Sequence, residues 1–341
     1  MEVNLVRAIF IFNSITVTIL GLLDAFAETY LPIAITSTYR YGRYAAEGKA
    51  ALIPPIEVPK RWFKHFYEFA APLSTYTLLI TLRFYLGVGN VPVNILQILD
   101  ILIGVNRQSL VSPEHTTLAL VLVTIHCWKR FYETHYVSIF SNVKINLSHY
   151  IVGFVHYVGT ISCLIGESNG FFKGILLILQ NQKLGNYFEL LINMTQIFCP
   201  GSRPIVNWNG LTYIDYSCSI IFLWATYKQL ICNKILSNLR KNKKGETVTL
   251  QHKIPKGDLF EYISSPLQLS EILVYLMLTI ILRNSQTFYY IFLWVLLNQV
   301  RIHRTLQNQV FVFSFKLTLQ TKLLFLGSNW STWSLVVRRV I

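Results

Sequence analysis

The sequence predicts an all-α, polytopic membrane protein in which about seven transmembrane helices form one bundle. Of its 341 residues, 53% are hydrophobic and only 13% are charged, whereas soluble domains carry about 25% charged residues. Apolar runs long enough to cross a bilayer as a helix, about 20 residues or a shorter tilted stretch, recur along the chain. The length of the chain therefore predicts a number of spans and not a number of soluble domains.

Seven apolar runs are expected to cross the membrane. They are Leu5 to Phe26, Glu68 to Val88, Glu114 to Glu133, Leu147 to Ile165, Leu211 to Cys232, Leu269 to Ile281 and Phe288 to Val300. The first run lacks the charged start and the cleavage site of a secretory signal, so we interpret it as a retained signal anchor. Residues 91 to 105 and two stretches within 171 to 200 are too short for a normal crossing and fit tilted or interfacial helices. Residues 37 to 65 are polar and predict a loop.

Charge and cysteine content exclude several classes of protein. Basic residues outnumber acidic ones by 30 to 16, which gives a formal charge of +14. The basic residues lie between apolar runs, where membrane topology and anionic lipid head groups account for them, so we expect a bilayer and no nucleic acid as partner. No Cys-x-x-Cys spacing joins the five cysteines, Cys127, Cys163, Cys199, Cys218 and Cys232. We interpret them as buried apolar residues and expect neither a disulfide framework nor a metal site.

A basic polar segment between two apolar runs is the strongest candidate for a binding site. It begins at Asn238 with Arg240, Lys241, Lys243 and Lys244, followed by a glycine. Clustered cations beside a glycine suit a ligand with several phosphates. The alternative is an ordinary positive cytoplasmic loop, which needs no ligand.

The spacing of the polar residues in this segment resembles a known family. The pattern is Asn238-x-Arg240, His252-x-Ile254-Pro255-x-Gly257-Asp258-x-Phe260-x-Tyr262-x-Ser264-x-Pro266 and Glu271. It is similar to the cofactor-binding signature of the steroid 5-alpha-reductase family. Two further phrases, residues 58–67 and 136–142, resemble the polyprenol reductase branch of that family. The resemblance implies a transmembrane reductase domain over residues 1–300, with its cofactor signature at 229–271.

The resemblance also implies NADPH as cofactor. The positions that match family residues facing the nucleotide are Gln229, Asn233, Asn238, Arg240, His252, Asp258, Tyr262 and Glu271. Arg240 and the neighbouring lysines would meet phosphate. No Gly-x-Gly-x-x-Gly follows a strand, so we expect the cofactor inside the helix bundle and not in a Rossmann domain.

Ionisable residues in one expected span are the candidate catalytic groups. His126, Lys129, Arg130 and Glu133 share one helical face, and Arg130 and Glu133 are spaced to form an ion pair. Charged groups inside a bilayer are costly and are usually paired or functional, although charges at a helix end also reach into the head groups. The resemblance places this helix at the active cavity, and we therefore take His126 and Glu133 as catalytic candidates.

His65 and Tyr67, beside the second span, complete the set of catalytic candidates. An isolated histidine or tyrosine near a membrane surface is more often an interfacial anchor. In the resemblance, Phe66 and Cys127 stand where the steroid enzymes have their catalytic Glu and Tyr. A steroid 3-ketone is therefore disfavoured as substrate.

The expected reaction is hydride transfer from NADPH to the α-isoprene double bond of a long-chain polyprenoid lipid. An alkene conjugated to an aldehyde accepts hydride far better than an isolated allylic alkene, so polyprenal is a more reasonable substrate than polyprenol. The resemblance implies a multi-pass protein of the endoplasmic reticulum that serves dolichol synthesis and protein N-glycosylation, and we expect a monomer. The alternatives are a trans-2-enoyl-CoA or 3-oxo-steroid 5-alpha reductase, and a catalytically impaired lipid-binding membrane protein.

Two departures from the family pattern favour the impaired alternative. Leu267 replaces the Asn expected to hold the nicotinamide amide, although Gln268 offers an amide next to it. Residues 301–341 form an atypical C-terminal tail without the family's His-x-Phe-Tyr-Lys, Tyr-Pro-Lys and Arg-Lys-Ala elements. We expect both changes to weaken nucleotide binding.

Overall fold

The computed structural model describes residues 3–27, 56–171, 205–242, 244–249 and 254–300. These residues form eight α-helices. The helices are α1 (Leu5–Phe26), α3 (Phe63–Tyr85), α4 (Val93–Leu102), α5 (Pro113–Tyr132), α6 (Leu147–Gly166), α9 (Tyr213–Asn238), α10 (Pro266–Ile281) and α11 (Gln286–Val300). Short elements join them: strands β1 (Glu57–Pro59) and β2 (Lys144–Asn146), 3-10 turns η3 (Lys60–Trp62), η5 (Trp208–Gly210) and η6 (Asp258–Glu261), and the π-helical turn η4 (Glu133–Val137).

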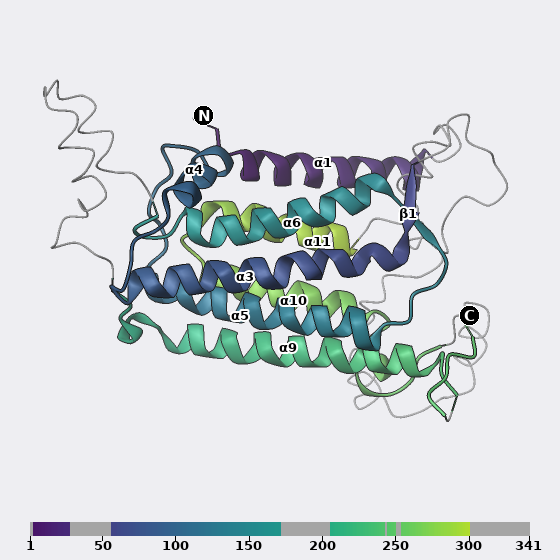
Figure 1. The fold of residues 1–341 in the computed structure, drawn as a ribbon. Coiled ribbons are helices and arrows are strands. Elements are labelled where there is room, and N and C mark those ends of the chain that lie inside the picture. The colour runs from purple at the N-terminus through teal and green to yellow at the C-terminus, as the bar shows by residue number, and fades with distance from the viewer. Residues whose placement is uncertain (1–2, 28–55, 172–204, 243, 250–253, 301–341) are drawn as a thin grey trace, which may run out of the picture.

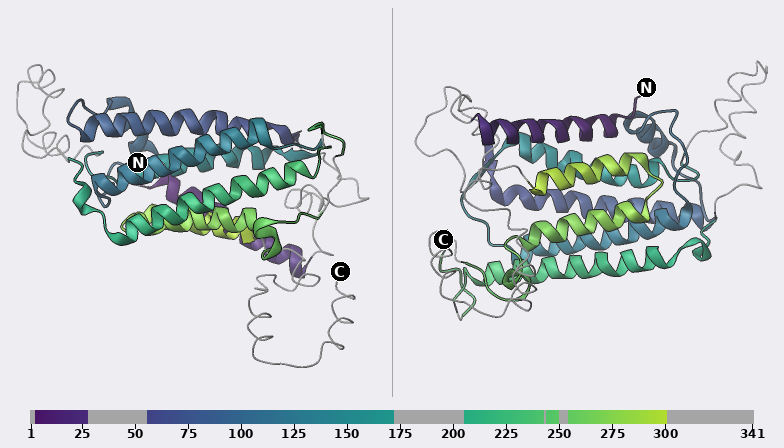
Figure 2. Two further views of the ribbon diagram at one scale, coloured as in Figure 1. Left: turned by 90° about the horizontal axis from the view of Figure 1, so that it is seen from below. Right: turned by 180° about the vertical axis from the view of Figure 1, so that it is seen from behind.

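The long helices lie side by side with alternating directions and form one bundle (Figure 1). Helix α3 packs against α5 and α6, and α9 packs against α10. Helix α11 lies between α10 and α1, which closes the bundle on the side opposite α9 (Figures 1 and 2). One end of the bundle therefore collects the N-terminal ends of α1, α5 and α9, and the other end collects their C-terminal ends.

All seven apolar runs that were expected to cross a membrane are helices. Helix α9 continues six residues beyond the expected end, so Asn238 is its last residue and does not belong to the following loop. The short run after α3 is the ten-residue helix α4. Among the described helices, two are long and apolar enough to span a membrane by length and composition alone, namely Leu5–Leu23 and Leu147–Gly166. The count of seven crossings stays a prediction, and the apolar pair expected within 171–200 lies outside the described residues.

Local sequence explains where several helices begin. Helices α5 and α10 each start at a proline, whose fixed φ and missing N–H suit the first helical position. Helix α9 starts with a capping box, in which Thr212 and Asp215 satisfy each other's backbone N–H groups. The Asn4 side chain caps α1 by accepting the backbone N–H of Arg7 at 2.8 Å.

The two strands, which are far apart in sequence, form a small antiparallel pair at the end of the bundle where α3 and α6 begin. Val58 pairs with Ile145, and both side chains are buried. Because β1 leads into α3 and β2 leads into α6, this pairing sets those helices side by side. Further along, the Phe66 ring lies so close to Gly153 that a β-carbon there would approach it to 2.6 Å, so α3 and α6 meet at a residue without a side chain.

Candidate active site

The polar face expected on α5 points into the bundle. His126 and Glu133 are buried, with 4% and 0% of their surfaces exposed. Glu133 begins the π-helical turn η4 at the end of the helix, a local geometry that is frequent at functional sites. The expected ion pair forms, with Arg130 Nη1 2.5 Å from Glu133 Oε2, and Lys129 Nζ lies 3.4 Å from Glu133 Oε1. The buried Glu133 carboxylate is thus balanced by two cations.

Tyr67 on α3 joins this group through Arg130. Arg130 donates from Nη2 and Nε to the Tyr67 hydroxyl oxygen, at 2.8 and 3.1 Å. The guanidinium carbon also lies 4.9 Å from the centre of the Tyr67 ring, within the range of a cation–π interaction. Tyr67 is therefore held in one position inside the bundle.

Gln229 on α9 and Glu271 on α10 continue the network. Gln229 Nε2 donates to Glu271 Oε2 at 2.6 Å, and Lys129 Nζ donates to Gln229 Oε1. His126 lies beside this pair, with Nε2 3.9 Å from Glu271 Oε2, and its Nδ1 is 3.3 Å from Thr226 Oγ1. We call the connected residues the central network: Tyr67, His126, Lys129, Arg130, Glu133, Gln229 and Glu271. Four helices contribute to it, and five of its seven members were predicted as site residues.

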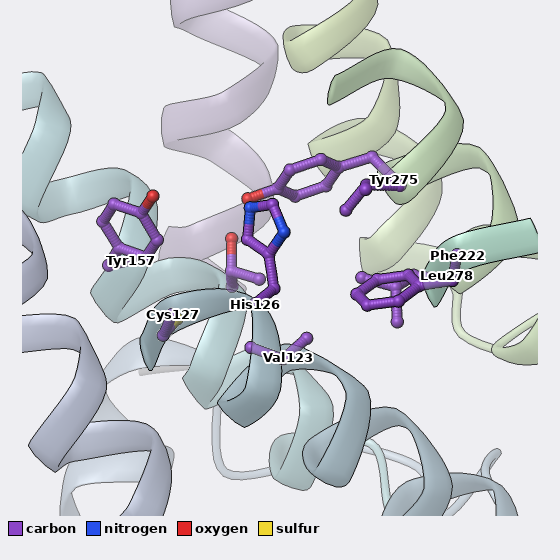
Figure 3. Close-up of a pocket in the computed structure, with 9 residues that line it drawn as sticks. Val123, His126, Cys127, Tyr157, Phe222, Tyr275 and Leu278 are labelled. Atoms are coloured by element: carbon purple, nitrogen blue, oxygen red, sulfur yellow. The ribbon is translucent and has the colours of Figure 1, made fainter. Parts of the chain in front are cut away.

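A small cavity opens beside His126 (Figure 3). Its lining comes from α5, α6, α9 and α10: Val123, His126, Cys127, Tyr157, Thr160, Phe222, Val274, Tyr275 and Leu278. The space open to the centre of a water-sized sphere is about 10 Å³, so the cavity would hold about one water molecule. The surface that faces the cavity is apolar, although His126, Thr160 and the two tyrosines are among the residues that border it. At this size the cavity fits at most a small apolar group, far less than a whole lipid.

The same side of α9 carries two buried polar atoms without a partner. Within the described part of the chain, neither Asn233 Nδ2 nor Ser237 Oγ makes a hydrogen bond. Gln229, Asn233 and Ser237 are spaced four residues apart and so share one helical face. Unpaired buried donors are costly and call for a ligand or an ordered water. This row of donors fits the hydroxyls, amide and phosphates expected of a dinucleotide.

Two cations lie at the end of this row. Arg240 donates from Nη1 to the backbone oxygen of Ile139, which fixes the guanidinium against the segment after α5. Burial lowers the pKa of Lys60, and the positive charge of Arg240 lowers it further. Two like charges close to each other attract an anion, so this end of the bundle suits phosphate.

The glycine-containing loop before α10 adopts a constrained backbone. Gly257 and Asp258 have φ values of 96° and 48°, in the left-handed region that favours Gly and, next to it, Asp and Asn. Asp258 accepts two hydrogen bonds from Lys228 Nζ, at 2.8 and 3.0 Å. The Lys228 ammonium, which donates to the carboxylate, lowers the pKa of Asp258. The ion pair ties this loop to α9.

The remaining predicted site residues lie apart from the central network. His65 contacts the Tyr150 hydroxyl at 2.9 Å through Nδ1 and packs against Trp62 near the start of α3. Asn238 is exposed at the end of α9, and Tyr262 is 65% exposed in the loop before α10. His252 lies outside the described residues.

Residues that the sequence did not single out complete the cavity wall. Tyr157, Thr160 and Tyr275 line it, Thr226 contacts His126, and His156 contacts Tyr275. His156 carried the one available signal, because an ionisable side chain inside an expected span is a candidate functional group by itself. The tyrosines and threonines had no such signal, since these residues are common in membrane helices. No group of three or more side chains that could hold a metal ion occurs among the described residues.

Comparisons with known proteins place the chain in a family. Residues 207–313 match the family model described as 3-oxo-5-alpha-steroid 4-dehydrogenase, which includes α9, α10 and α11. The polyprenal reductase of Drosophila melanogaster is 34% identical over 307 residues, covering 87% of this chain and 85% of the relative. The human polyprenal reductase is 30% identical over 71% of this chain and 69% of the relative. The chain therefore belongs to the 3-oxo-5-alpha-steroid 4-dehydrogenase, or steroid 5-alpha-reductase, family, and within it to the polyprenal reductases.

Proposed function

We propose that this protein reduces the α-isoprene double bond of polyprenal with NADPH, a step of dolichol synthesis that supports protein N-glycosylation. The observation that carries the proposal is the 34% identity to a polyprenal reductase along 87% of the chain. The central network agrees with it, because a buried set of ion pairs beside a largely apolar cavity suits a lipid with one reactive polar end. The oxidoreductase acts on a CH–CH group and takes a nicotinamide nucleotide as its reductant.

The bound dihydronicotinamide supplies the hydride. Gln229 and Glu271 hold its amide end, because a side-chain amide and a carboxylate offer both a donor and an acceptor there. Asn233 and Ser237 contact the sugar or phosphate oxygens with their unpaired groups, and Arg240 meets a phosphate. Asp258 and Tyr262 order the loop that covers the nucleotide. Asn238 and His252 remain proposed contacts at the same end.

The chain's own groups prepare the aldehyde for reduction. His126 lies at the cavity, and the tautomer with its proton on Nε2 donates a hydrogen bond to the carbonyl oxygen, on which negative charge develops, while Nδ1 accepts from Thr226 Oγ1. Glu133, Lys129 and Arg130 keep this part of α5 charged and rigid, and Arg130 fixes Tyr67. His65 lies near the start of α3, apart from the central network, so we assign it no contact with the reacting atoms.

The outer surface supports insertion into a membrane. Large apolar side chains point outward along the helices, including Phe12, Ile15, Ile19, Ile220 and Trp224, each at least 45% exposed. Such extensive apolar exposure marks contact with lipid. We propose seven crossings, formed by α1, α3, α5, α6, α9, α10 and α11, in the endoplasmic reticulum, with the protein acting as a monomer.

Two side chains count against a steroid substrate. Phe66, at the position of the family's catalytic Glu, packs on Tyr150 and Phe154, and Cys127 replaces the catalytic Tyr at the cavity wall. A hydrocarbon ring and a buried thiol do not provide the acid that polarises a 3-ketone. The impaired lipid-binding protein is the second candidate, favoured by Leu267 at the start of α10.

The test is reduction of a polyprenal by membranes that express the full chain, with NADPH as reductant. Arg240→Ala is the variant, and Lys234→Ala is the matched control for loss of one positive charge, because Lys234 is exposed near the end of α9, the helix that precedes Arg240. We expect wild type and Lys234→Ala to produce the saturated aldehyde, and Arg240→Ala to need about tenfold or more NADPH for the same rate.

The outcomes separate the candidates. Turnover that Arg240→Ala weakens and a higher NADPH concentration restores supports the reductase. A folded wild-type chain that is stabilised by polyprenal but never turns it over would establish the impaired lipid-binding protein instead.

A further inference from the structure

The cavity beside His126 is also bordered by a tyrosine that the reaction outlined above leaves without a role. Tyr275 on α10 lines it and is 4% exposed. Its hydroxyl oxygen lies 2.5 Å from Nε2 of His156 on α6. In Figure 3 this hydroxyl points toward the side of the cavity on which the His126 ring lies. Two helices thus bring a phenol and a supporting imidazole to the place where a substrate carbonyl would lie.

The other nitrogen of His156 indicates which way this hydrogen bond runs. Nδ1 is buried and has no partner among the described residues. A neutral imidazole has one N–H donor and one acceptor nitrogen, and an unpaired buried N–H is rarer than an unpaired acceptor. The proton therefore belongs on Nε2, which donates to the Tyr275 oxygen. The proton of Tyr275 itself is then free to point into the cavity.

The other tyrosines near the cavity are less suited to this role. The Tyr67 hydroxyl already accepts two hydrogen bonds from Arg130, and Tyr67 is not part of the cavity wall. Tyr157 borders the cavity, and its ring packs on Tyr67 with 5.5 Å between the ring centres. It is less suited because the imidazole of His156 supports the hydroxyl of Tyr275 instead.

We propose that Tyr275 is the catalytic acid of the reduction and that His156 is its positioning residue, an inference that rests on the proposed function. The β carbon of the enal accepts the hydride and forms a C–H bond. The π electrons of the Cα=Cβ bond form a new double bond between Cα and the carbonyl carbon. The π electrons of the carbonyl bond move to the oxygen, which takes the Tyr275 proton. The resulting enol becomes the saturated aldehyde by moving that proton to Cα. The tyrosinate, stabilised by His156 Nε2–H, regains a proton from water.

The test compares single variants of the full chain in membranes. Tyr275→Phe removes only the hydroxyl, and we expect kcat to fall by roughly 10²–10³-fold with KM changed less than about threefold. His156→Gln keeps an N–H donor near Nε2, so it should retain clearly more kcat than His156→Leu. Tyr85→Phe is the matched control, because it also removes a buried tyrosine hydroxyl, bonded to Asn169 O at 2.9 Å, at the far end of the bundle. Its kcat should stay within about twofold of wild type.

Each result decides between the possibilities. A Tyr275→Phe enzyme with kcat within about threefold of wild type overturns the inference while leaving the proposed function standing. Loss of NADPH-dependent thermal stabilisation in Tyr275→Phe, beyond any loss in Tyr85→Phe, assigns a structural role and also overturns it. Equal kcat for His156→Gln and His156→Leu removes His156 from its positioning role. A folded wild-type chain without turnover refutes the proposed function, and this inference with it.

Discussion

Both halves of the bundle bury carboxylates, but the buried polar groups of the two halves are paired to different extents. At the end that holds the start of α5 and α9, Glu167 and Asp215 have partners on both oxygens. In the half toward the C-terminal ends of α5 and α9, the central network and the cavity wall leave His126 Nε2, Thr160 Oγ1 and His156 Nδ1 unpaired within the described chain. The first half also has unpaired atoms, on Arg7, Thr81 and Arg107, but both of its buried carboxylates are fully paired, whereas the unpaired atoms of the second half include two residues that line the cavity beside His126.

The carboxylates of the first half join helices that are far apart in sequence. Glu167, after α6, accepts from Ser285 Oγ at 2.6 Å and from Thr287 N at 3.3 Å, and it pairs with Arg7 of α1 at 3.4 Å. Asp215 of α9 pairs with Arg283, which follows α10, at 2.9 Å and with His115 of α5 at 3.2 Å. We call these two sets the closed cluster.

The difference teaches how to separate structural from chemical buried charge. A buried carboxylate whose every oxygen is satisfied stabilises the fold and has no capacity left for a ligand. A network with unpaired groups at a cavity carries a cost that folding alone does not require, and such groups are typical of binding and catalysis. The variants below test this distinction, beginning with the largest expected effect.

Glu167→Ala should destabilise the protein most and leave the site intact. It leaves the Ser285 hydroxyl and the Thr287 N–H and hydroxyl without an acceptor, and each unpaired buried donor costs about 1–3 kcal/mol. We expect the free energy of unfolding in detergent to fall by about 3 kcal/mol or more. Glu167→Gln, which keeps an acceptor oxygen, should lose less. Nucleotide affinity of the folded variant should stay near that of wild type, and a large change there would contradict the division into two halves.

Glu271→Ala should show the opposite behaviour. We expect nucleotide affinity, measured by titration of thermal stabilisation, to fall about 10–100-fold, since a hydrogen bond to a charged group contributes about 1.5–3 kcal/mol. Unfolding without nucleotide should change much less than in Glu167→Ala. Glu246→Gln, on the turn after α9, is the control for loss of a negative charge. Equal affinity in Glu271→Ala and wild type would remove Glu271 from the nucleotide site.

Leu267→Asn should improve nucleotide binding modestly. An amide at the start of α10 adds a hydrogen bond, which contributes about 0.5–1.5 kcal/mol, or roughly two- to tenfold in affinity. Leu267→Met keeps an apolar side chain and should bring no gain. Tighter binding in Leu267→Asn alone would identify Leu267 as a cause of weakened nucleotide binding, and no gain would assign the amide contact to Gln268 or Gln229.

Asp258→Asn should have the smallest effect on folding. The Lys228–Asp258 pair lies at the surface with side chains 24% and 22% exposed, so salt screens it in part and the fold gains little from it. Because the pKa of Asp258 is lowered in the folded protein, its contribution is present above the pKa of the unfolded chain. It is lost as the pH falls through the folded-state pKa. The melting temperatures of wild type and Asp258→Asn should therefore differ slightly near neutral pH, less in high salt, and not at all in strong acid. A difference that grows on acidification would contradict this.

The sequence by itself determined the helices and much of the polar face. Apolar runs, prolines and caps place all seven expected helices, because these signals act within a few residues. The spacing of His126, Arg130 and Glu133 was enough to predict their shared face and the ion pair. The motif around Gly257 and Glu271 was enough to suggest a nucleotide site and the steroid 5-alpha-reductase family. The similarity to polyprenal reductases confirms the family.

Only the tertiary structure decided which polar groups meet. Lys129 and Gln229 are on different helices, and the helix-to-helix packing that joins them has no local signature. The same holds for Tyr275 on α10 and His156 on α6: the tyrosine looks like an ordinary membrane-helix residue, and the histidine in its span does not reveal which residue it contacts. The tertiary structure also places His65 apart from the central network, because its hydrogen-bond partner Tyr150 comes from the neighbouring helix α6. A site built from four helices depends on packing between segments that are distant in sequence, and a local sequence pattern does not specify that packing.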